Sequence, residues 1–274
     1  MPDSGTELYL DLLKRCLLNL IYEDPRIPFG WDVDASEGVY KNFDLESRLN
    51  GSDWPSTAHT MIGMRRLDNI QALFEDVLAT QTPGDLIETG VWRGGSTIFM
   101  RGLLKAYGVT DRTVWVADSF EGFPHPNQEG VSARSFSSPG LAEARTGPPP
   151  AHVQVILDRL MQGTSYADVR EHFARYGLLD EQVQFLRGWF RDTLPAAPIT
   201  RLALLRLDGD LYDSTYDALQ ALYPKLSVGG YAIVDDYRTF VECQQAVHDY
   251  LEATRTKVDP HDIDAEAVFW QKRD

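Results

Sequence analysis

The sequence has few of the features that mark secreted, membrane-spanning or metal-thiolate proteins. Only two cysteines occur among 274 residues, Cys16 and Cys243. Both fall in stretches with helical spacing, where a cysteine more often fills core space than forms a disulfide or binds a metal. No apolar run approaches the roughly 20 residues of a membrane helix, and no charged-then-apolar signal pattern opens the sequence. We therefore expect a soluble, cytoplasmic protein without membrane association.

Basic residues are also scarce. Lys and Arg number 26 against 41 Asp and Glu, which gives a formal net charge of −15. This balance argues against a nucleic-acid partner and against a large anionic substrate. A neutral or cationic small molecule suits the composition better.

Strand and helix patterns alternate from residue 85 onward. Strands are expected at 85–89, 113–118, 182–187, 202–207, 230–235 and 267–272, and helices at 95–107, about 165–176, 214–225 and 240–253. Such alternation is typical of α/β proteins with a mostly parallel, doubly wound sheet and helices on both faces. A hairpin at 262–271 would add a strand at the sheet edge, for seven in all.

The residues before this pattern predict an N-terminal extension. Helical spacing covers 6–22 and the apolar residues between Met64 and Leu78, whereas 24–58 show no clear period. We expect an N-terminal helical extension and lid segment over 1–62 and the α/β domain over 63–274. A long polar loop at about 124–150 predicts a flexible lid, with a passive linker as the alternative. The apolar helix at 6–22 suggests a homodimer or higher oligomer.

Four aspartates follow two short apolar runs. Asp208 and Asp210 come after 202–207, and Asp235 and Asp236 come after 231–234. Runs of this kind are typical of buried parallel strands, and ligands bind beyond the carboxyl ends of such strands. Clustered carboxylates suit Mg²⁺, and the absence of His and Cys from these motifs makes zinc less suitable.

A structural alternative exists for these acids. Asp210 or Asp213 could cap the following helix, and Asp235 with Asp236 could form a solvated turn. Arg206 is unusual inside a buried apolar run, and it suggests an ion pair with an acid of the site or of the neighbouring strand.

The stretch DLIETGVWRGGS, residues 85–96, predicts a strand, a glycine turn and a helix start. Its spacing departs from the dinucleotide fingerprint, and Glu88 would repel a pyrophosphate. The same carboxylate favours S-adenosylmethionine, which carries a sulfonium and an ammonium but no phosphate. Asp118 ends the next strand, where an acid commonly binds ribose hydroxyls. The expected cofactor-binding residues are Glu88, Thr89, Gly90, Val91, Ser96, Asp118 and Ser119; the alternative is a purely structural glycine turn.

Several motifs in the same order resemble one family. ETGVWRGGS, WVADSFEGFP, RLDGDLYDST and GGYAIVDDY, with ELYLDLLKR near the N-terminus and the segment 57–63, are similar to the macrocin O-methyltransferase (TylF-type) family of antibiotic biosynthesis. The resemblance covers about 7–270 and finds no matching pattern within 126–166.

The resemblance implies a Rossmann-like class I methyltransferase that uses S-adenosylmethionine and Mg²⁺. The acceptor would be a deoxysugar hydroxyl on a natural-product glycoside, such as a macrolide, or on its nucleotide-sugar precursor. By position, Asp208, Asp235 and Asp236 would be the metal ligands and Asp210 the general base. Trp54, Met61 and Tyr212 are expected to contact the acceptor.

Three other functions are compatible with parts of the sequence. A metal-dependent O-methyltransferase for catechol-like hydroxyls would use a similar glycine loop and paired acids. A non-catalytic binding protein on the same fold would not need the complete set of acids. A nicotinamide-dependent oxidoreductase is disfavoured by Glu88 and by the missing dinucleotide fingerprint.

Overall fold

The computed structural model describes residues 4–27, 40–138, 141–142, 147–148 and 151–274. Two units are distinguished by their internal contacts. The first comprises Met1–Gln71, Trp92–Asp111 and Pro149–Asp180, and the second comprises Ala72–Val91, Arg112–Pro148 and Glu181–Asp274. The sequence-based boundary between residues 62 and 63 stays a prediction. No helix in the described part of the chain is long and apolar enough to cross a membrane.

The second unit contains a seven-stranded sheet in the order β5-β4-β3-β6-β7-β9-β8. The strands are β3 (Asp85–Thr89), β4 (Val114–Asp118), β5 (Val183–Arg187), β6 (Leu202–Leu207), β7 (Leu226–Val234), β8 (His261–Asp262) and β9 (Val268–Gln271). The neighbours from β5 to β7 run parallel, whereas β9 pairs antiparallel with β7 and β8 with β9. The predicted α/β class, the strand number and the edge hairpin are confirmed.

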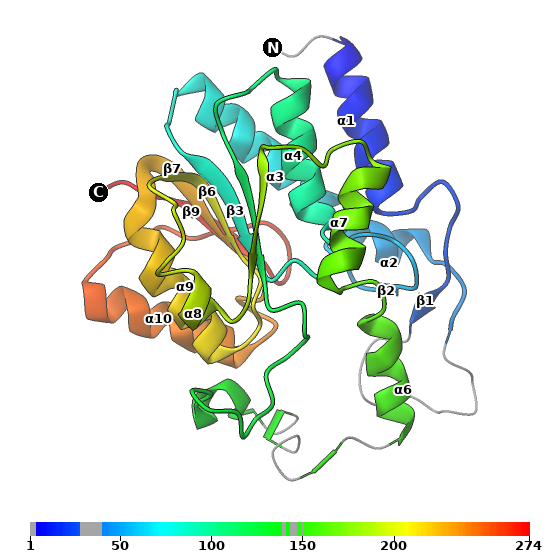
Figure 1. The fold of residues 1–274 in the computed structure, drawn as a ribbon, viewed down its shortest axis with the longest axis vertical. Coiled ribbons are helices and arrows are strands. Elements are labelled where there is room, and N and C mark those ends of the chain that lie inside the picture. Colours follow the sequence, from blue (N-terminus) through cyan, green and yellow to red (C-terminus); the bar gives the residue numbers. More distant parts are fainter. Residues whose placement is uncertain (1–3, 28–39, 139–140, 143–146, 149–150) are drawn as a thin grey trace. The chain divides into compact units, whose positions relative to one another are not determined.

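Helices α8 (Phe190–Thr193), α9 (Tyr212–Leu222) and α10 (Val241–Thr254) lie close together in the second unit (Figure 1). Their apolar side chains share one core with residues of β6, β7 and β9. The helix predicted at 214–225 begins earlier and passes into a 3-10 turn, η3 (Tyr223–Lys225), because Pro224 cannot donate the next helical hydrogen bond. Strand β7 begins at Leu226, four residues before the predicted start at Gly230.

The first unit contains the N-terminal helix and the helix that follows the glycine turn. Its elements are α1 (Ser4–Leu17), β1 (Arg26–Ile27), α2 (Leu45–Asn50), β2 (Trp54–Pro55), α4 (Gly95–Ala106), α6 (Ala151–Leu160) and α7 (Tyr166–Arg175), and α3 (Gly63–Ala79) extends from it into the second unit. Gly102 on α4 allows helix α1 to pack closely against it, since a Cβ at this position would lie only 2.3 Å from Leu13 Cδ2. Leu8 and Leu12 on α1 remain exposed, and the homodimer stays a prediction.

The described residues 24–27 and 40–58 contain more order than the sequence predicts. Strands β1 and β2 pair antiparallel, and Asp44 caps α2 by accepting a hydrogen bond from Ser47 N. Helix α6 was likewise not predicted. Strands β1 and β2 and helix α2 are too short and have too few apolar residues to show a period. Helix α6 does carry apolar residues at helical spacing, at Val153, Ile156 and Leu160.

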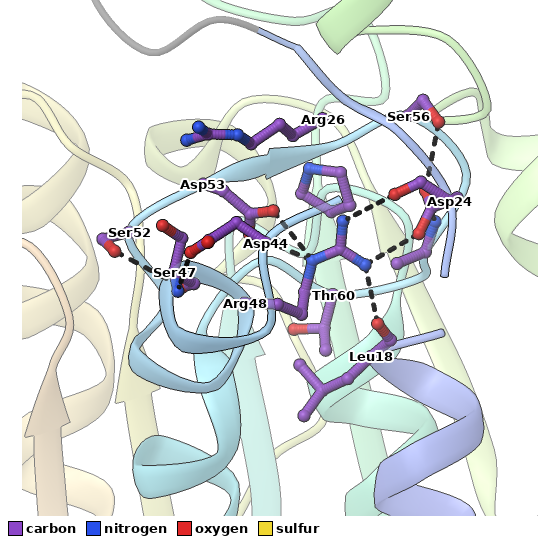
Figure 2. A network of polar contacts seen from close by, with 12 residues as sticks. Leu18, Asp24, Arg26, Asp44, Ser47, Arg48, Ser52, Asp53, Ser56 and Thr60 are labelled. Carbon is purple, nitrogen blue, oxygen red and sulfur yellow. Dashed lines mark hydrogen bonds and ion pairs between the residues drawn. The ribbon is translucent and has the colours of Figure 1, made fainter. Parts of the chain in front are cut away.

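A fully buried arginine, Arg48, makes hydrogen bonds to several segments around this region (Figure 2). Its Nε donates to both carboxylate oxygens of Asp53 at 3.0 Å, and Nη1 donates to Asp24 Oδ1 at 2.7 Å and to Leu18 O at 2.8 Å. The guanidinium therefore joins the end of α1 to the segments before and after α2. The planar guanidinium, with several N–H donors in a fixed arrangement, suits contacts to several acceptors at once.

The second oxygen of Asp24 holds the segment after β2. Asp24 Oδ2 accepts hydrogen bonds from Ser56 Oγ at 3.1 Å, Thr57 N at 2.5 Å and Ala58 N at 3.1 Å. Another buried arginine, Arg93, donates from Nη1 to Pro55 O at 3.1 Å and to Ala58 O at 3.0 Å. The backbone after Trp54 is thus held by Asp24 and Arg93.

Two histidines lie beside this segment and lose affinity for protons on folding. The rings of His59 and His172 are 4.3 Å apart, and His59 Nδ1 lies 2.8 Å from Tyr176 Oη. Burial, followed by His172 and Arg93, lowers the pKa of His59 from 6.5 to about 4. Burial is also the main cause that lowers the pKa of His172.

We expect acid to destabilise the protein through these histidines. Between about pH 6.5 and pH 4 the unfolded chain binds a proton at His59 and the folded chain does not. The unfolding free energy then falls as the pH is lowered, by at most about 1.4 kcal/mol per pH unit for one histidine. Urea unfolding from pH 7.5 to pH 5 measures this slope. His59→Gln should flatten it and exposed His125→Gln should not; equal slopes in all three proteins would contradict the prediction.

Candidate active site

Three aspartates meet at the carboxyl ends of β6 and β7. These strands are parallel, with Leu207 opposite Val234, so that Asp208 and Asp235 follow at neighbouring positions. Oxygen atoms of Asp208, Asp235 and Asp236 lie within 4.8 Å of one another. This set of carboxylate oxygens is compatible with a hard divalent cation such as Mg²⁺.

Arg206 lies beneath these acids and is fully buried. Its Nη1 donates to Glu88 Oε1 and to Asp208 Oδ2, both at 2.5 Å, and its Nη2 contacts Asp235 Oδ1. Burial lowers the pKa of Arg206, but the charges of Asp208, Asp235 and Glu88 outweigh burial and raise it well above the usual value. The sequence left open whether Arg206 pairs with an acid of the site or of the neighbouring strand. The structure shows both, since Arg206 contacts Asp208 and Asp235 of the site and Glu88 of β3.

Asp210 is placed beside the three-aspartate cluster by a left-handed backbone. Its φ is 58°, and its backbone N donates to Asp236 Oδ2 at 3.3 Å. Burial, followed by the charges of Asp208 and Asp235, raises the pKa of Asp210 well above its usual range. The residue that caps α9 is Leu211, and it makes no side-chain capping bond. The capping alternative for Asp210 is therefore not supported.

The glycine turn after β3 touches the loop that carries Asp208. Gly90 has φ 84°, and a Cβ there would lie 1.8 Å from Asp208 O. The backbone N of Asp208 donates to Thr89 O at 2.9 Å, and Gly90 N donates to Ala117 O at 2.9 Å. Only glycine allows both the dihedral angle and the close approach.

Asp118 connects the loops after β3 and β4. Its Oδ2 accepts a hydrogen bond from Val91 N at 2.8 Å, and its Oδ1 accepts one from Phe120 N at 2.7 Å. Ser119 Oγ donates to Gly122 O at 3.1 Å and shapes the second loop. These contacts hold both loops in place, and the predicted binding of ribose hydroxyls by Asp118 stays a prediction.

The remaining predicted residues are divided between the two units. Ser96 in the first turn of α4, Trp54 in β2 and Met61 belong to the first unit. Tyr212 belongs to the second and is buried, and its hydroxyl donates to Asp249 Oδ2 at 2.8 Å. The Arg134 guanidinium lies over the Tyr212 ring, 4.4 Å from its centroid. The role of Tyr212 toward an acceptor stays a prediction.

Two acids anchor part of the predicted lid, a role that the sequence did not predict for either of them: Asp213 was considered only as a helix cap, and Glu242 was not considered. Asp213 on α9 accepts hydrogen bonds from Ser132 N at 2.6 Å and from Ser135 Oγ at 2.7 Å. Glu242 on α10 accepts from Ser137 N at 3.1 Å and from Ser138 N at 2.6 Å. The short helix η2 (Ala133–Phe136) lies within this stretch. The four serines in VSARSFSS were the sequence feature that could have indicated these contacts, but their partners are distant in sequence. Residues 139–140, 143–146 and 149–150 of the predicted lid lie outside the described residues.

Comparisons with known proteins identify the family of this chain. The family model for Macrocin-O-methyltransferase (TylF) matches residues 6–272. Mycinamicin III 3''-O-methyltransferase of Micromonospora griseorubida is 47% identical, with 99% of this chain and 98% of the relative covered. A 4'-O-methyltransferase of Streptomyces olivaceus, which acts on 8-demethyl-8-(2,3-dimethoxy-alpha-L-rhamnosyl)-tetracenomycin-C, is 50% identical, with coverage of 99% and 95%.

The solved structure of the O-methyltransferase NovP is also similar. It superposes with a TM-score of 0.83 at 45% identity, covering 98% of this chain and 100% of NovP. The calicheamicin methyltransferase CalS11 shares the fold alone, with a TM-score of 0.56 at 20% identity and coverage of 100% and 95%. The chain belongs to the macrocin O-methyltransferase family and is an S-adenosylmethionine-dependent O-methyltransferase.

Proposed function

We propose that the protein methylates a hydroxyl of a deoxysugar on a natural-product glycoside or on its nucleotide-sugar precursor, with the aid of Mg²⁺. The observation that carries this proposal is the convergence of Asp208, Asp235 and Asp236 with Asp210 beside them. Support for the acceptor comes from the names of the relatives, which specify mycinamicin III and a rhamnosyl tetracenomycin C.

In this proposal the acids of the second unit have three different roles: metal binding, proton acceptance and cofactor binding. Asp208, Asp235 and Asp236 would hold Mg²⁺, which when bound lowers the pKa of the acceptor hydroxyl and orients it. Asp210 would accept the hydroxyl proton during methyl transfer, in which the oxygen–carbon bond forms as the methyl carbon–sulfur bond breaks and S-adenosylhomocysteine is the leaving group. Glu88 would favour the positive charge of the cofactor, and Asp118 would bind its ribose hydroxyls. Holding oxygen, methyl carbon and sulfur in line supplies much of the remaining acceleration.

Calorimetric titration tests the cofactor and metal parts together. S-adenosylmethionine and S-adenosylhomocysteine are titrated into metal-stripped protein, followed by MgCl₂, for the wild type and Asp208→Asn. We expect both proteins to bind the cofactors and only the wild type to bind Mg²⁺, because the substitution removes one charged ligand. Asp217→Asn on α9 is the matched control and should bind Mg²⁺ like the wild type. Absence of cofactor binding to the wild type would overturn the reading of the glycine turn.

The acceptor class is tested separately by methyl transfer to a panel of deoxysugar glycosides, nucleotide deoxysugars and catechols. We expect transfer to sugar hydroxyls. Transfer to catechols without transfer to any sugar would favour the catechol alternative, because vicinal oxygens bind Mg²⁺ in either case. If the wild type binds the cofactor but transfers no methyl group to any acceptor, the result would favour the non-catalytic alternative.

A further inference from the structure

The side chain of Arg206 lies at the point where three carboxylates from three segments meet. In the parallel register Arg206 on β6 is opposite Glu88 on β3 and Ile233 on β7. Glu88 approaches from one neighbouring strand, Asp235 from the end of the other, and Asp208 from the same strand two residues on. Each of the three contacts one of the two Nη atoms.

Several carboxyl groups lie close together around this arginine. Glu88 and Asp235 are buried, and Asp236 and Asp210 add further carboxyl groups next to the cluster. Carboxylates so close together repel one another strongly where water is excluded. A cation is needed to hold them in one arrangement, and the described part of the chain provides the Arg206 guanidinium in direct contact with three of them.

We propose that Arg206 is the built-in counter-cation of this cluster, which keeps Glu88, Asp208 and Asp235 in place so that a divalent ion enters and leaves a preformed site. This inference extends the proposed metal site. Arg206 is a positioning residue here, since it acts through the acids and is buried beneath them. Its fork geometry allows contacts to several acids that a single ammonium group cannot reproduce.

Thermal unfolding with and without the ion tests this role. Arg206→Met keeps an unbranched side chain of similar length and removes the charge. In EDTA we expect its Tm to fall by on the order of 10 °C relative to the wild type. Saturating MgCl₂ should restore most of this loss, because a bound dication replaces the missing charge. The wild type should change much less between EDTA and MgCl₂.

The matched control is Arg101→Met. Arg101 on α4 is also buried, and it pairs through Nε and Nη2 with Asp180 at 2.9 and 2.5 Å. Its removal should lower the Tm equally in EDTA and in MgCl₂. Recovery by the ion is therefore a readout that a general loss of packing does not produce. A Tm of Arg206→Met that is equally low in both solutions would overturn the inference.

A second variant keeps the inference testable if Arg206→Met does not fold. Arg206→Met combined with Asp235→Asn removes one positive and one negative charge together. We expect this double variant to fold and to be more stable in EDTA than Arg206→Met alone, with little response to Mg²⁺. A double variant that fails to fold, or that is no more stable than the single one, would count against a charge-balancing role.

The comparison in EDTA also separates this inference from the proposed function. If the wild type binds no Mg²⁺ in calorimetry, the metal proposal fails. The stability of Arg206→Met and of the double variant in EDTA still measures whether Arg206 balances the acids. Conversely, the wild type could bind Mg²⁺ normally while the double variant is no more stable in EDTA than Arg206→Met. That result would contradict the inference about Arg206 and leave the metal proposal intact.

Discussion

Asp210→Asn is expected to lower kcat by on the order of 10²- to 10⁴-fold while leaving cofactor binding within a few-fold of the wild type. Asparagine preserves the shape of the side chain and tolerates the left-handed backbone that Asp210 adopts with φ 58°. It also keeps the backbone N–H that donates to Asp236. The change therefore removes the proton acceptor with little disturbance of the loop. Single-turnover methyl transfer measures the chemical step, and calorimetry measures binding.

Asp217→Asn is the control for this prediction. Asp217 lies on α9, and burial together with the charge of Asp213 raises its pKa to about 6. It is therefore a partly buried acid of the same unit without a proposed role in the reaction. We expect its kcat to match that of the wild type. If Asp210→Asn retained wild-type kcat, another group would have to accept the proton.

Arg48→Met is expected to destabilise the protein by about 3–5 kcal/mol, the range for breaking a buried ion pair by removing one partner. Two carboxylates, Asp24 and Asp53, would lose their shared counter-charge inside the protein. The backbone contacts to Leu18 O and Asp24 O would be lost with the guanidinium. Urea unfolding at neutral pH measures the difference. We expect proteolysis to begin within 24–58, because this arginine joins those segments.

Arg15→Met on α1 provides the comparison. Arg15 pairs with Asp11 across one helical turn, and both side chains are more than half exposed. Exposed pairs of this kind contribute at most about 0.5 kcal/mol. If both variants lost a similar unfolding free energy, the burial of Arg48 would not explain its contribution to stability.

The parts of the fold that were predictable are those with a strong local pattern. The strands 85–89 and 202–207 were predicted at their observed bounds, because short apolar runs next to glycine turns and prolines are distinctive. The elements β1, α2 and β2 were missed because each is only two to six residues long and contains few apolar residues. Helix α6 was missed although Val153, Ile156 and Leu160 show helical spacing, because it directly follows the Gly- and Pro-rich stretch that ends at Pro150. Arg48 illustrates the difference, since nothing local to RLNGSD indicates that its side chain is buried against Asp24.

The acids of the candidate site follow the same division. Their types and their positions after two parallel strands were determined by the sequence, because strands of a parallel sheet carry their carboxyl ends to one edge. Their mutual distances, the left-handed backbone of Asp210 and the three contacts of Arg206 were decided only by the tertiary structure. A local sequence specifies which groups a strand end presents, whereas strand order and register decide which of them meet.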